Sequence, residues 1–402
     1  MHDIYKLKNT IQEYAWGSRT AIPELSGEKS PSENPQAELW MGAHPKAPSL
    51  VEVEGSLVSL NYFIKRHPDG ILGEKVAQRF NNQLPFLFKV IAAEKPLSIQ
   101  AHPNREQAID GFKRENSLEI PLDSPNRNYR DENHKPEIIC ALTNFWALNG
   151  FRKIVEIIEL ADMLRGEELE REIDTMKKQP NSSGLKIFFE SLMMIPDERK
   201  KSIVKIMVEK SSKLENQNII FKWICRLHDE YPADIGILAP VYLNLIELKP
   251  GEAMFLDAGD LHAYLEGVGI ELMANSDNVL RGGLTPKHVD VPELMKIVNF
   301  REKKLELIDP ADTVSCERVY VTPAEEFELS VIELKKGSEY SSDLYHGIEI
   351  MIVVDGEALI RDIHRGNAIE LPKGSSILVP SIATDYRMTG RAVIYKAGIP
   401  KI

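Results

Sequence analysis

The apolar pattern of this 402-residue chain changes period twice, and these changes limit the folds it can adopt. Up to about residue 152, short apolar runs such as LPFLFKVIAA (84–93) alternate with clusters of Gly, Pro, Asn and Asp, a pattern typical of β-strands. Between 153 and 232, Gly and Pro become sparse and apolar residues recur at helical spacing. Strand-like runs return from 233 onward. The sequence therefore predicts a mainly β protein with a helical insert.

Local signals refine this prediction. The segment DERKKSIVKIMVEKSSKL (197–214) begins with acidic residues and ends with lysine, which suits the helix dipole and predicts a helix. The segment QPNSSG (179–184) is predicted to be a loop. Asp355-Gly356 lies between β-branched runs and predicts a hairpin turn.

Four polar side chains on three short segments form a candidate metal site: Gln100, His102, Glu137 and His262. If residues 97–101 form a strand, Gln100 and His102 project from one face of it. Two imidazoles, a carboxylate and an amide oxygen suit a divalent cation such as zinc. One such residue beside apolar neighbours is more often structural, so the prediction depends on the three segments converging.

Composition excludes several classes of function. The formal net charge of -12 argues against binding to a nucleic-acid backbone, which needs a basic surface. Cys140, Cys225 and Cys316 are far apart and odd in number, so neither a disulfide framework nor a thiolate zinc site is expected. MHDIYKLKNT lacks a signal-peptide core, and no apolar run is long enough to span a bilayer. We therefore expect a cytoplasmic protein with no membrane partner.

A weak internal repeat relates two parts of the chain. LKPGEAMFLDAGDLHAY (248–264) and LPKGSSILVPSIATDY (371–386) share a layout of strand end, glycine turn, apolar run and second turn. Aligning Gly251 with Gly374 places Asp385 opposite His262. Two related β-barrel modules, only one of which has the histidine, would produce this pattern.

Five longer motifs carry a family resemblance that extends over essentially the whole chain. They are QEYAWGS (12–18), AELWMGAHPKAPS (37–49), LPFLFKVIAAEKPLSIQAHP (84–103), NHKPE (133–137) and GVGIELMANSDNVLRGGLTPK (267–287). In these motifs the chain resembles the type I mannose-6-phosphate isomerases, also called phosphomannose isomerases, and most of all the bacterial form. The insert and the last hundred or so residues match in layout alone.

This resemblance implies a zinc-dependent enzyme that interconverts mannose 6-phosphate and fructose 6-phosphate. It implies one zinc ion per chain, held by the same four residues that the ligand chemistry indicates. It also implies an active-site arginine at Arg281 and substrate-associated residues at Ser98 and Lys135.

The family fold implies two cupin-like β-barrel (jelly-roll) domains and an all-α domain. We predict a catalytic cupin-like domain formed by 1–152 and 233–301, with a helical insert at 153–232. Residues 302–402 are predicted to form a C-terminal cupin-like domain without a metal site.

Aldose–ketose isomerisation moves a proton between C1 and C2 through a cis-enediol or enediolate. Arg281 keeps its proton, so we expect it to stabilise charge or position the substrate. Lys135 and Glu271 are both candidates for the general base, and His134 lies next to Lys135. The sequence leaves this choice open.

The substrate phosphate needs cationic or hydroxyl partners, and the candidates are Arg281, Lys287, Ser98 and Lys135. Further candidate substrate contacts are Trp16, Asp277, Tyr264 and His134. Trp16 has core packing as its alternative role, and Asp277 has turn capping.

Two other functions fit parts of this pattern. Two histidines and a carboxylate also describe a non-haem metal cupin oxygenase, although Gln100 and the nearby cations argue against it. A sugar-phosphate-binding protein without catalysis is the second alternative. A monomer is expected, with a weak homo-oligomer as the alternative.

Overall fold

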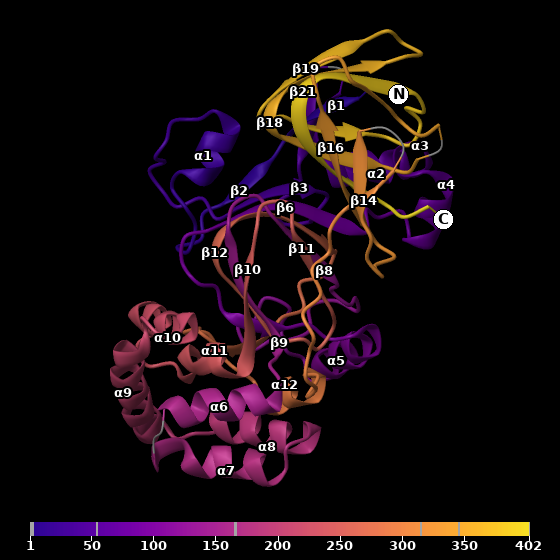
Figure 1. The fold of residues 1–402 in the computed structure, drawn as a ribbon. Coiled ribbons are helices and arrows are strands. Elements are labelled where there is room, and N and C mark those ends of the chain that lie inside the picture. The colour runs from indigo at the N-terminus through magenta and orange to yellow at the C-terminus, as the bar shows by residue number, and fades with distance from the viewer. Residues whose placement is uncertain (1–3, 54, 165–166, 314–315, 345, 402) are drawn as a thin grey trace.

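The computed structural model describes residues 4–53, 55–164, 167–313, 316–344 and 346–401. Two large antiparallel sheets lie one above the other, and a group of helices covers the far end of the lower sheet (Figure 1). This arrangement confirms the predicted class, which was mainly β with two cupin-like modules and a helical insert. Among the described residues, no helix is long and apolar enough to cross a membrane.

The lower sheet belongs to what we call the first module and has ten strands. They are β2 (Thr10–Gln12), β3 (Glu38–Gly42), β6 (Phe86–Ala93), β7 (Ile99–Ala101), β8 (Glu137–Ala141), β9 (Phe145–Phe151), β10 (Leu243–Leu248), β11 (Ala253–Leu256), β12 (His262–Ala274) and β13 (Leu280–Gly283). Strand β12 pairs with β6, β7, β8 and β9, so it holds the module together.

The upper sheet has eleven strands. They are β1 (Tyr5–Lys8), β4 (Leu50–Val53), β5 (Ser56–Ser59), β14 (Ala311–Asp312), β15 (Glu317–Tyr320), β16 (Glu328–Leu334), β17 (Glu339–Ser341), β18 (Glu349–Asp362), β19 (Ala368–Pro372), β20 (Ser376–Val379) and β21 (Tyr386–Gly398). We call the part from 302 onward the C-terminal module. Strand β1 pairs with β20, so the two ends of the chain share one sheet. The predicted division into three domains stays a prediction.

The repeat seen in the sequence corresponds to equivalent strand pairing. Strand β8 pairs with β11 and β12, and β18 pairs with β20 and β21 in the same antiparallel manner. Glu137 lies opposite Leu256, whereas Glu349 lies opposite Val379. Leu256 and Val379 each follow their aligned glycine by the same number of residues, so Glu349 occupies the place of Glu137 in the second copy.

The helical insert is built from amphipathic helices that bury one face. They are α6 (Ile154–Leu164), α7 (Glu170–Lys178), α8 (Ser182–Met193), α9 (Asp197–Leu214) and α10 (Ile219–Glu230), with short turns η1 (Glu167–Leu169), η2 (Ile235–Leu238) and α11 (Ala239–Tyr242). The prediction of a helix over 197–214 is confirmed. Phe189 of α8 packs edge-on against Phe151 of β9, with 5.7 Å between ring centroids, so insert and first module share a core.

The loop predicted at 179–184 is wrong in its second half. Helix α8 begins at Ser182, because the side-chain oxygen of Asn181 accepts hydrogen bonds from the amides of Ser183 and Gly184. An asparagine in this position satisfies amides that have no partner inside the helix. The loop is therefore confined to the residues before the cap.

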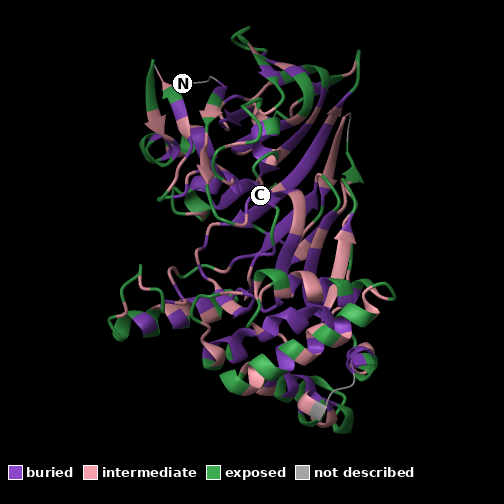
Figure 2. Ribbon diagram, turned by 90° about the vertical axis from the view of Figure 1, so that its left-hand side faces the viewer, coloured by how far each residue is buried: buried purple, intermediate pink, exposed green. Residues whose placement is uncertain are grey.

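Short helices connect the strands of both modules. They are α1 (Ala21–Ser26), α2 (Leu60–Arg66), α3 (Pro68–Leu72), α4 (Glu74–Arg79), α5 (Arg105–Ser117) and α12 (Val291–Ile297). Phe86 and Phe88 of β6 belong to the same fully buried cluster as Ile350 of β18 and Leu378 of β20. Buried strands accordingly run continuously through the middle of the molecule (Figure 2). The two modules share one apolar core.

The predicted hairpin at Asp355-Gly356 is wrong. Strand β18 continues through this dipeptide and stays paired with β21, with a bulge between Val353 and Asp355. Gly356 has a φ of 72°, and a β carbon there would collide with the carbonyl oxygen of Arg391. A glycine with positive φ serves a bulge as well as a turn, so the dipeptide alone does not distinguish them.

Replacing Gly356 with alanine tests this interpretation. The control is Gly337→Ala, because φ there is also positive but an added β carbon would meet no other atom. We expect the control to lower the free energy of unfolding by about 1–2 kcal/mol. Gly356→Ala should cost at least a further ~1–3 kcal/mol, since the neighbouring strand must move. Urea unfolding of both variants measures the difference. Equal losses of stability would show that the close approach of β21 is unimportant.

Candidate metal centre

Three side chains from different strands converge in the first module. His102 follows β7, whereas Glu137 and His262 are the first residues of β8 and β12. Glu137 Oε2 lies 3.5 Å from His102 Nε2 and 3.4 Å from His262 Nε2, and all three side chains are at most 3% exposed. Because β12 pairs with both β7 and β8, the sheet itself brings the three side chains together.

Backbone carbonyls orient both imidazoles. His102 Nδ1 lies 2.7 Å from the carbonyl oxygen of Asn278, and His262 Nδ1 lies 2.9 Å from that of Asp260. Each Nδ1 must donate to its carbonyl, so each Nε2 turns a lone pair inward, as metal-binding histidines do. His102 Nε2 is buried and has no hydrogen-bond partner. Burial, together with the Lys135 charge, lowers the pKa of His102 to about 4, so the ring is neutral and suited to a cation.

Lys135 neutralises the buried carboxylate. Its Nζ lies 2.8 Å from Glu137 Oε1, and the lysine is itself buried. Burial alone would raise the pKa of Glu137, but Lys135 provides the largest opposing charge, and this pKa lies well below its ordinary value. The carboxylate is therefore ionised and available as a metal ligand.

Strand register places Gln100 with the cluster. Gln100 of β7 lies directly opposite His262 of β12 and opposite Arg281 of β13. Residues directly opposite in antiparallel strands project from the same face of the sheet. The amide of Gln100 and the guanidinium of Arg281 thus share a face with His262.

A second buried network continues from the cluster along β12. Tyr264 donates to Glu271 Oε1 at 2.8 Å, and Lys89 Nζ donates to Glu271 Oε2 at 2.8 Å. Lys89 also lies 3.6 Å from Glu38. Desolvation opposes charge on Lys89, but Glu271 and Glu38 outweigh it and raise its pKa. Lys89 therefore stays charged inside the barrel.

Three cations interact electrostatically, and one of them, Arg281, lies opposite Gln100. Burial lowers the pKa of Arg281, and the charge of Arg130 lowers it further. The pKa of exposed Lys287 is lowered by partial burial and then by both arginines. A concentration of positive charge in a chain of net charge -12 is the arrangement that a phosphate requires.

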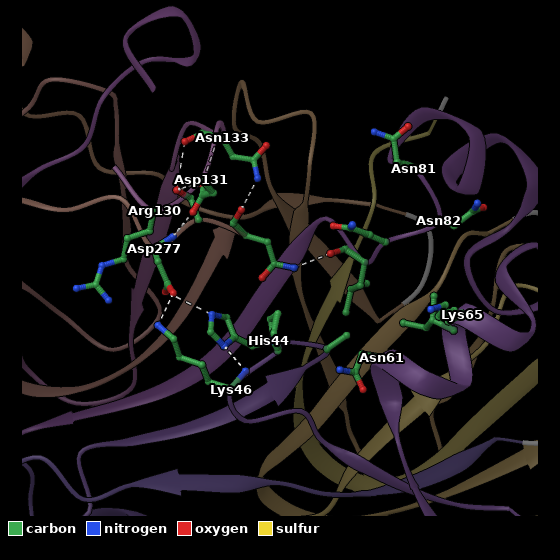
Figure 3. Close-up of a pocket in the computed structure, with 17 residues that line it drawn as sticks. His44, Lys46, Asn61, Lys65, Asn81, Asn82, Arg130, Asp131, Asn133 and Asp277 are labelled. Carbon is green, nitrogen blue, oxygen red and sulfur yellow. Dashed lines mark hydrogen bonds and ion pairs between the residues drawn. The ribbon is translucent and has the colours of Figure 1, made fainter. Parts of the chain in front are cut away.

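Asp277 lies at the edge of a neighbouring cavity of about 840 Å³ (Figure 3). Lys46 Nζ approaches its carboxylate to 2.7 Å and His44 Nε2 to 3.3 Å. The guanidinium of Arg130 points away from the wall formed by Asn61 and Lys65. Asp277 is therefore already held by two basic side chains.

The remaining predicted site residues have different surroundings. His134 Nε2 lies 2.7 Å from Glu326 Oε1, so its ring turns toward the C-terminal module. Trp16 stacks on Tyr14 with 5.8 Å between ring centroids and packs on the core beside Tyr264. Ser98 is half-buried just before β7.

Sequence reasoning missed Lys89 and Arg130. Lys89 did carry a signal, because it is the one charged residue of β6, all eight of whose residues are buried. A lysine inside such a strand needs a buried counter-charge. Arg130 lies in a connection that has no periodicity, so nothing local marks it.

Two buried imidazoles and a buried carboxylate that converge inside a β-barrel are typical of a metal-dependent enzyme of the cupin type. Comparisons with known proteins identify the family to which the chain belongs. Residues 4–154 match the model of the catalytic domain of type I phosphomannose isomerase, and residues 163–243 match that of its helical insertion domain.

Several relatives match over most of their length. Mannose-6-phosphate isomerase of Salmonella typhimurium is 43% identical over 358 residues, which cover 89% of this chain and 90% of that protein. The Homo sapiens protein of the same name is 34% identical, and the match covers 94% and 93% of the two chains.

Solved structures of phosphomannose isomerases also superpose on this chain over nearly its whole length. A zinc-bound mannose 6-phosphate isomerase superposes with a TM-score of 0.91 at 40% identity, covering 98% of this chain and 99% of that one. A glutamate-to-alanine mutant of phosphomannose isomerase from Salmonella typhimurium superposes with a TM-score of 0.92 at 39% identity, covering 99% and 100%. The chain belongs to the type I phosphomannose isomerase family. It is therefore an isomerase.

The paired charges of the second network should be essential to stability. In Lys89→Met, Glu271 loses its buried partner, so we expect a loss of about 3–5 kcal/mol. The matched control is Lys46→Met, which breaks the more exposed pair with Asp277 and should cost about 0–1 kcal/mol. Urea unfolding measures both. A small loss for Lys89→Met would mean that Glu271 does not need this counter-charge.

Proposed function

We propose that this chain interconverts mannose 6-phosphate and fructose 6-phosphate at a zinc site formed by Gln100, His102, Glu137 and His262. One observation carries the proposal: both buried imidazoles are fixed by carbonyls so that their Nε2 atoms face the Glu137 carboxylate. The names of the relatives supply the substrate, and the register of β7 supports Gln100 as fourth ligand.

The reaction removes a proton from one carbon and returns it to its neighbour. Negative charge develops on the two sugar oxygens in the cis-enediolate, and bound zinc supplies Lewis-acid stabilisation of that charge. Arg281 projects from the same face as His262 and adds a permanent positive charge there. Its proposed role is to stabilise and orient the sugar oxygens.

Lys135 is our candidate for the group that carries the proton between C1 and C2: as a neutral amine it would accept the proton from one carbon, and as the resulting ammonium it would return it to the other. It is buried beside the ligand cluster, and its ion pair with Glu137 Oε1 holds its amine there. Glu271 is less suitable because Tyr264 occupies one of its oxygens and Lys89 the other. We assign Glu271 to positioning these two side chains.

The phosphate is assigned to the cations beside the cluster. After burial, the charge of Arg130 lowers the pKa of Arg281, and the charges of both arginines lower the pKa of Lys287, which supports electrostatic contact among the three. The phosphate dianion of the substrate would relieve the repulsion among these cations. Its binding would also hold C1 and C2 of the sugar in place. Arg130 joins the candidates that the sequence provided.

Other side chains would contact or shape the sugar site. Trp16 and Tyr264 lie against the same apolar cluster and Ser98 precedes Gln100, so we place these three beside the sugar. Asp277 and His134 are held by other side chains, so we propose that they shape the site.

Location and assembly remain proposals. The chain has only three cysteines, far apart in sequence, so a disulfide framework is not expected, which supports a reducing, cytoplasmic location. We propose a monomer, which analytical ultracentrifugation would test.

Metal removal tests the proposed function directly. Chelation should abolish conversion of mannose 6-phosphate in a coupled assay, and added zinc should restore it. His262→Ala should lose zinc and turnover together, whereas Arg281→Ala should keep zinc but lose turnover. The matched control is His364→Ala, an exposed histidine of the C-terminal module, which should change neither.

Two results would contradict this proposal. The first is full turnover after verified removal of the metal. The second is oxygen consumption with bound iron, which would favour the oxygenase alternative that also uses two histidines and one carboxylate.

Truncation of Arg130 tests the phosphate assignment. Arg130→Ala keeps the backbone amide that donates to Asn278 at 2.6 Å, so the fold should be retained. Losing a charge-assisted hydrogen bond should raise KM for the sugar phosphate about tenfold or more, with a smaller effect on kcat. The control is Arg171→Ala on exposed helix α7. An unchanged KM would remove Arg130 from the phosphate site.

A further inference from the structure

A buried carboxylate of the C-terminal module contacts the first module close to the metal ligands. Glu326 lies between β15 and β16, and its side chain is 6% exposed. Its Oε1 is 2.7 Å from His134 Nε2 and 2.8 Å from Arg105 Nη2. One oxygen atom therefore holds two basic side chains of the first module.

These two partners belong to the segments that carry metal ligands. Arg105 comes three residues after His102 and is the first residue of α5. His134 comes three residues before Glu137 and directly precedes Lys135. Arg105 Nη2 also lies 3.1 Å from His134 Nε2, so Glu326 completes a three-residue cluster that ties the His102 segment to the Glu137 segment.

We propose that Glu326 is a positioning residue for the zinc site, through which the C-terminal module completes the catalytic centre. This inference rests on the proposed function and gives the C-terminal module a role there. His102 and Glu137 must keep their separation to share one ion, and residues that orient metal ligands typically change metal affinity by about 10–100-fold.

The energetics of the contact support this assignment. Burial opposes the charge on Glu326, yet His134 and Arg105 lower its pKa, so the carboxylate is ionised. A buried ionised carboxylate is tolerated only when its partners are in place. The observed spacing of the two segments is therefore the arrangement in which Glu326 Oε1 has both basic partners.

The adjacent residue provides a matched control. Glu325 is 70% exposed and forms an ion pair with Arg79 at the end of α4. It also connects the C-terminal module to the first part of the chain, but Arg79 is not on a ligand segment. Comparing zinc affinity in the Glu326 and Glu325 variants distinguishes an effect of module docking from an effect on the position of the metal ligands.

The experiment uses the full chain and measures zinc affinity by competition with a chelator, kcat and KM, and the Tm of the metal-free protein. Glu326→Ala should weaken zinc binding about 10–100-fold, and Glu325→Ala should leave it within about twofold. Glu326→Gln keeps an acceptor oxygen and should recover part of the loss. Arg105→Ala should weaken zinc binding, and combining it with Glu326→Ala should add little.

Wild-type zinc affinity in Glu326→Ala, or an equal loss in Glu325→Ala, would overturn the inference. If Glu326→Ala does not fold, Arg105→Ala and Glu326→Gln decide, because Arg105 is 56% exposed and Gln preserves the shape of the side chain. Wild-type protein that binds no zinc or forms no fructose 6-phosphate would instead contradict the proposed function. The two failures are therefore distinguishable.

Discussion

The pairing of strand β12 sets the geometry on which the site depends. Its N-terminal half pairs with β7 and β9, and its C-terminal half pairs with β6 and β8. Gly267, with a φ of 130°, lies between these halves where a β carbon would meet the backbone of the neighbouring strand. Because side chains alternate along a strand, a slip of one residue would turn His262 and Glu271 to the opposite face.

Burial of charge is the second constraint. The site holds carboxylates and lysines in one barrel, and Glu137 and Glu271 each have a lysine within hydrogen-bond distance. Such pairs add little stability compared with apolar packing, yet breaking one is costly. The barrel thus maintains a polar interior whose lysine–carboxylate pairs form only in one arrangement. Zinc would enter a site whose ligands are already oriented.

Local signals predicted much of this structure. The helix at 197–214 was predicted to its limits because its charge and apolar pattern agree, and the zinc ligand candidates followed from ligand chemistry and family motifs. Pairing between distant segments was not predictable in this way. Strand β1 joins β20, and Glu326 reaches His134, through contacts that leave no trace in local periodicity.

Glycine and lysine show why the remaining signals were ambiguous. Gly356 supplies a positive φ that a bulge uses as readily as a hairpin turn. Lys89 lies in an apolar run, and its counter-charges come from other strands, so its burial could be inferred but its partners could not. Contacts with distant strands decide whether Gly356 forms a bulge and which residues pair with Lys89, and local sequence patterns do not reveal those contacts.

Anomalous diffraction at the zinc absorption edge tests the central claim most directly, because it locates the ion in crystals of the intact chain. We predict one strong peak about 2.0–2.2 Å from His102 Nε2, His262 Nε2 and a carboxylate oxygen of Glu137, with the amide of Gln100 completing the ligands. No peak at this position in zinc-loaded crystals, or a peak at other side chains, would contradict the account.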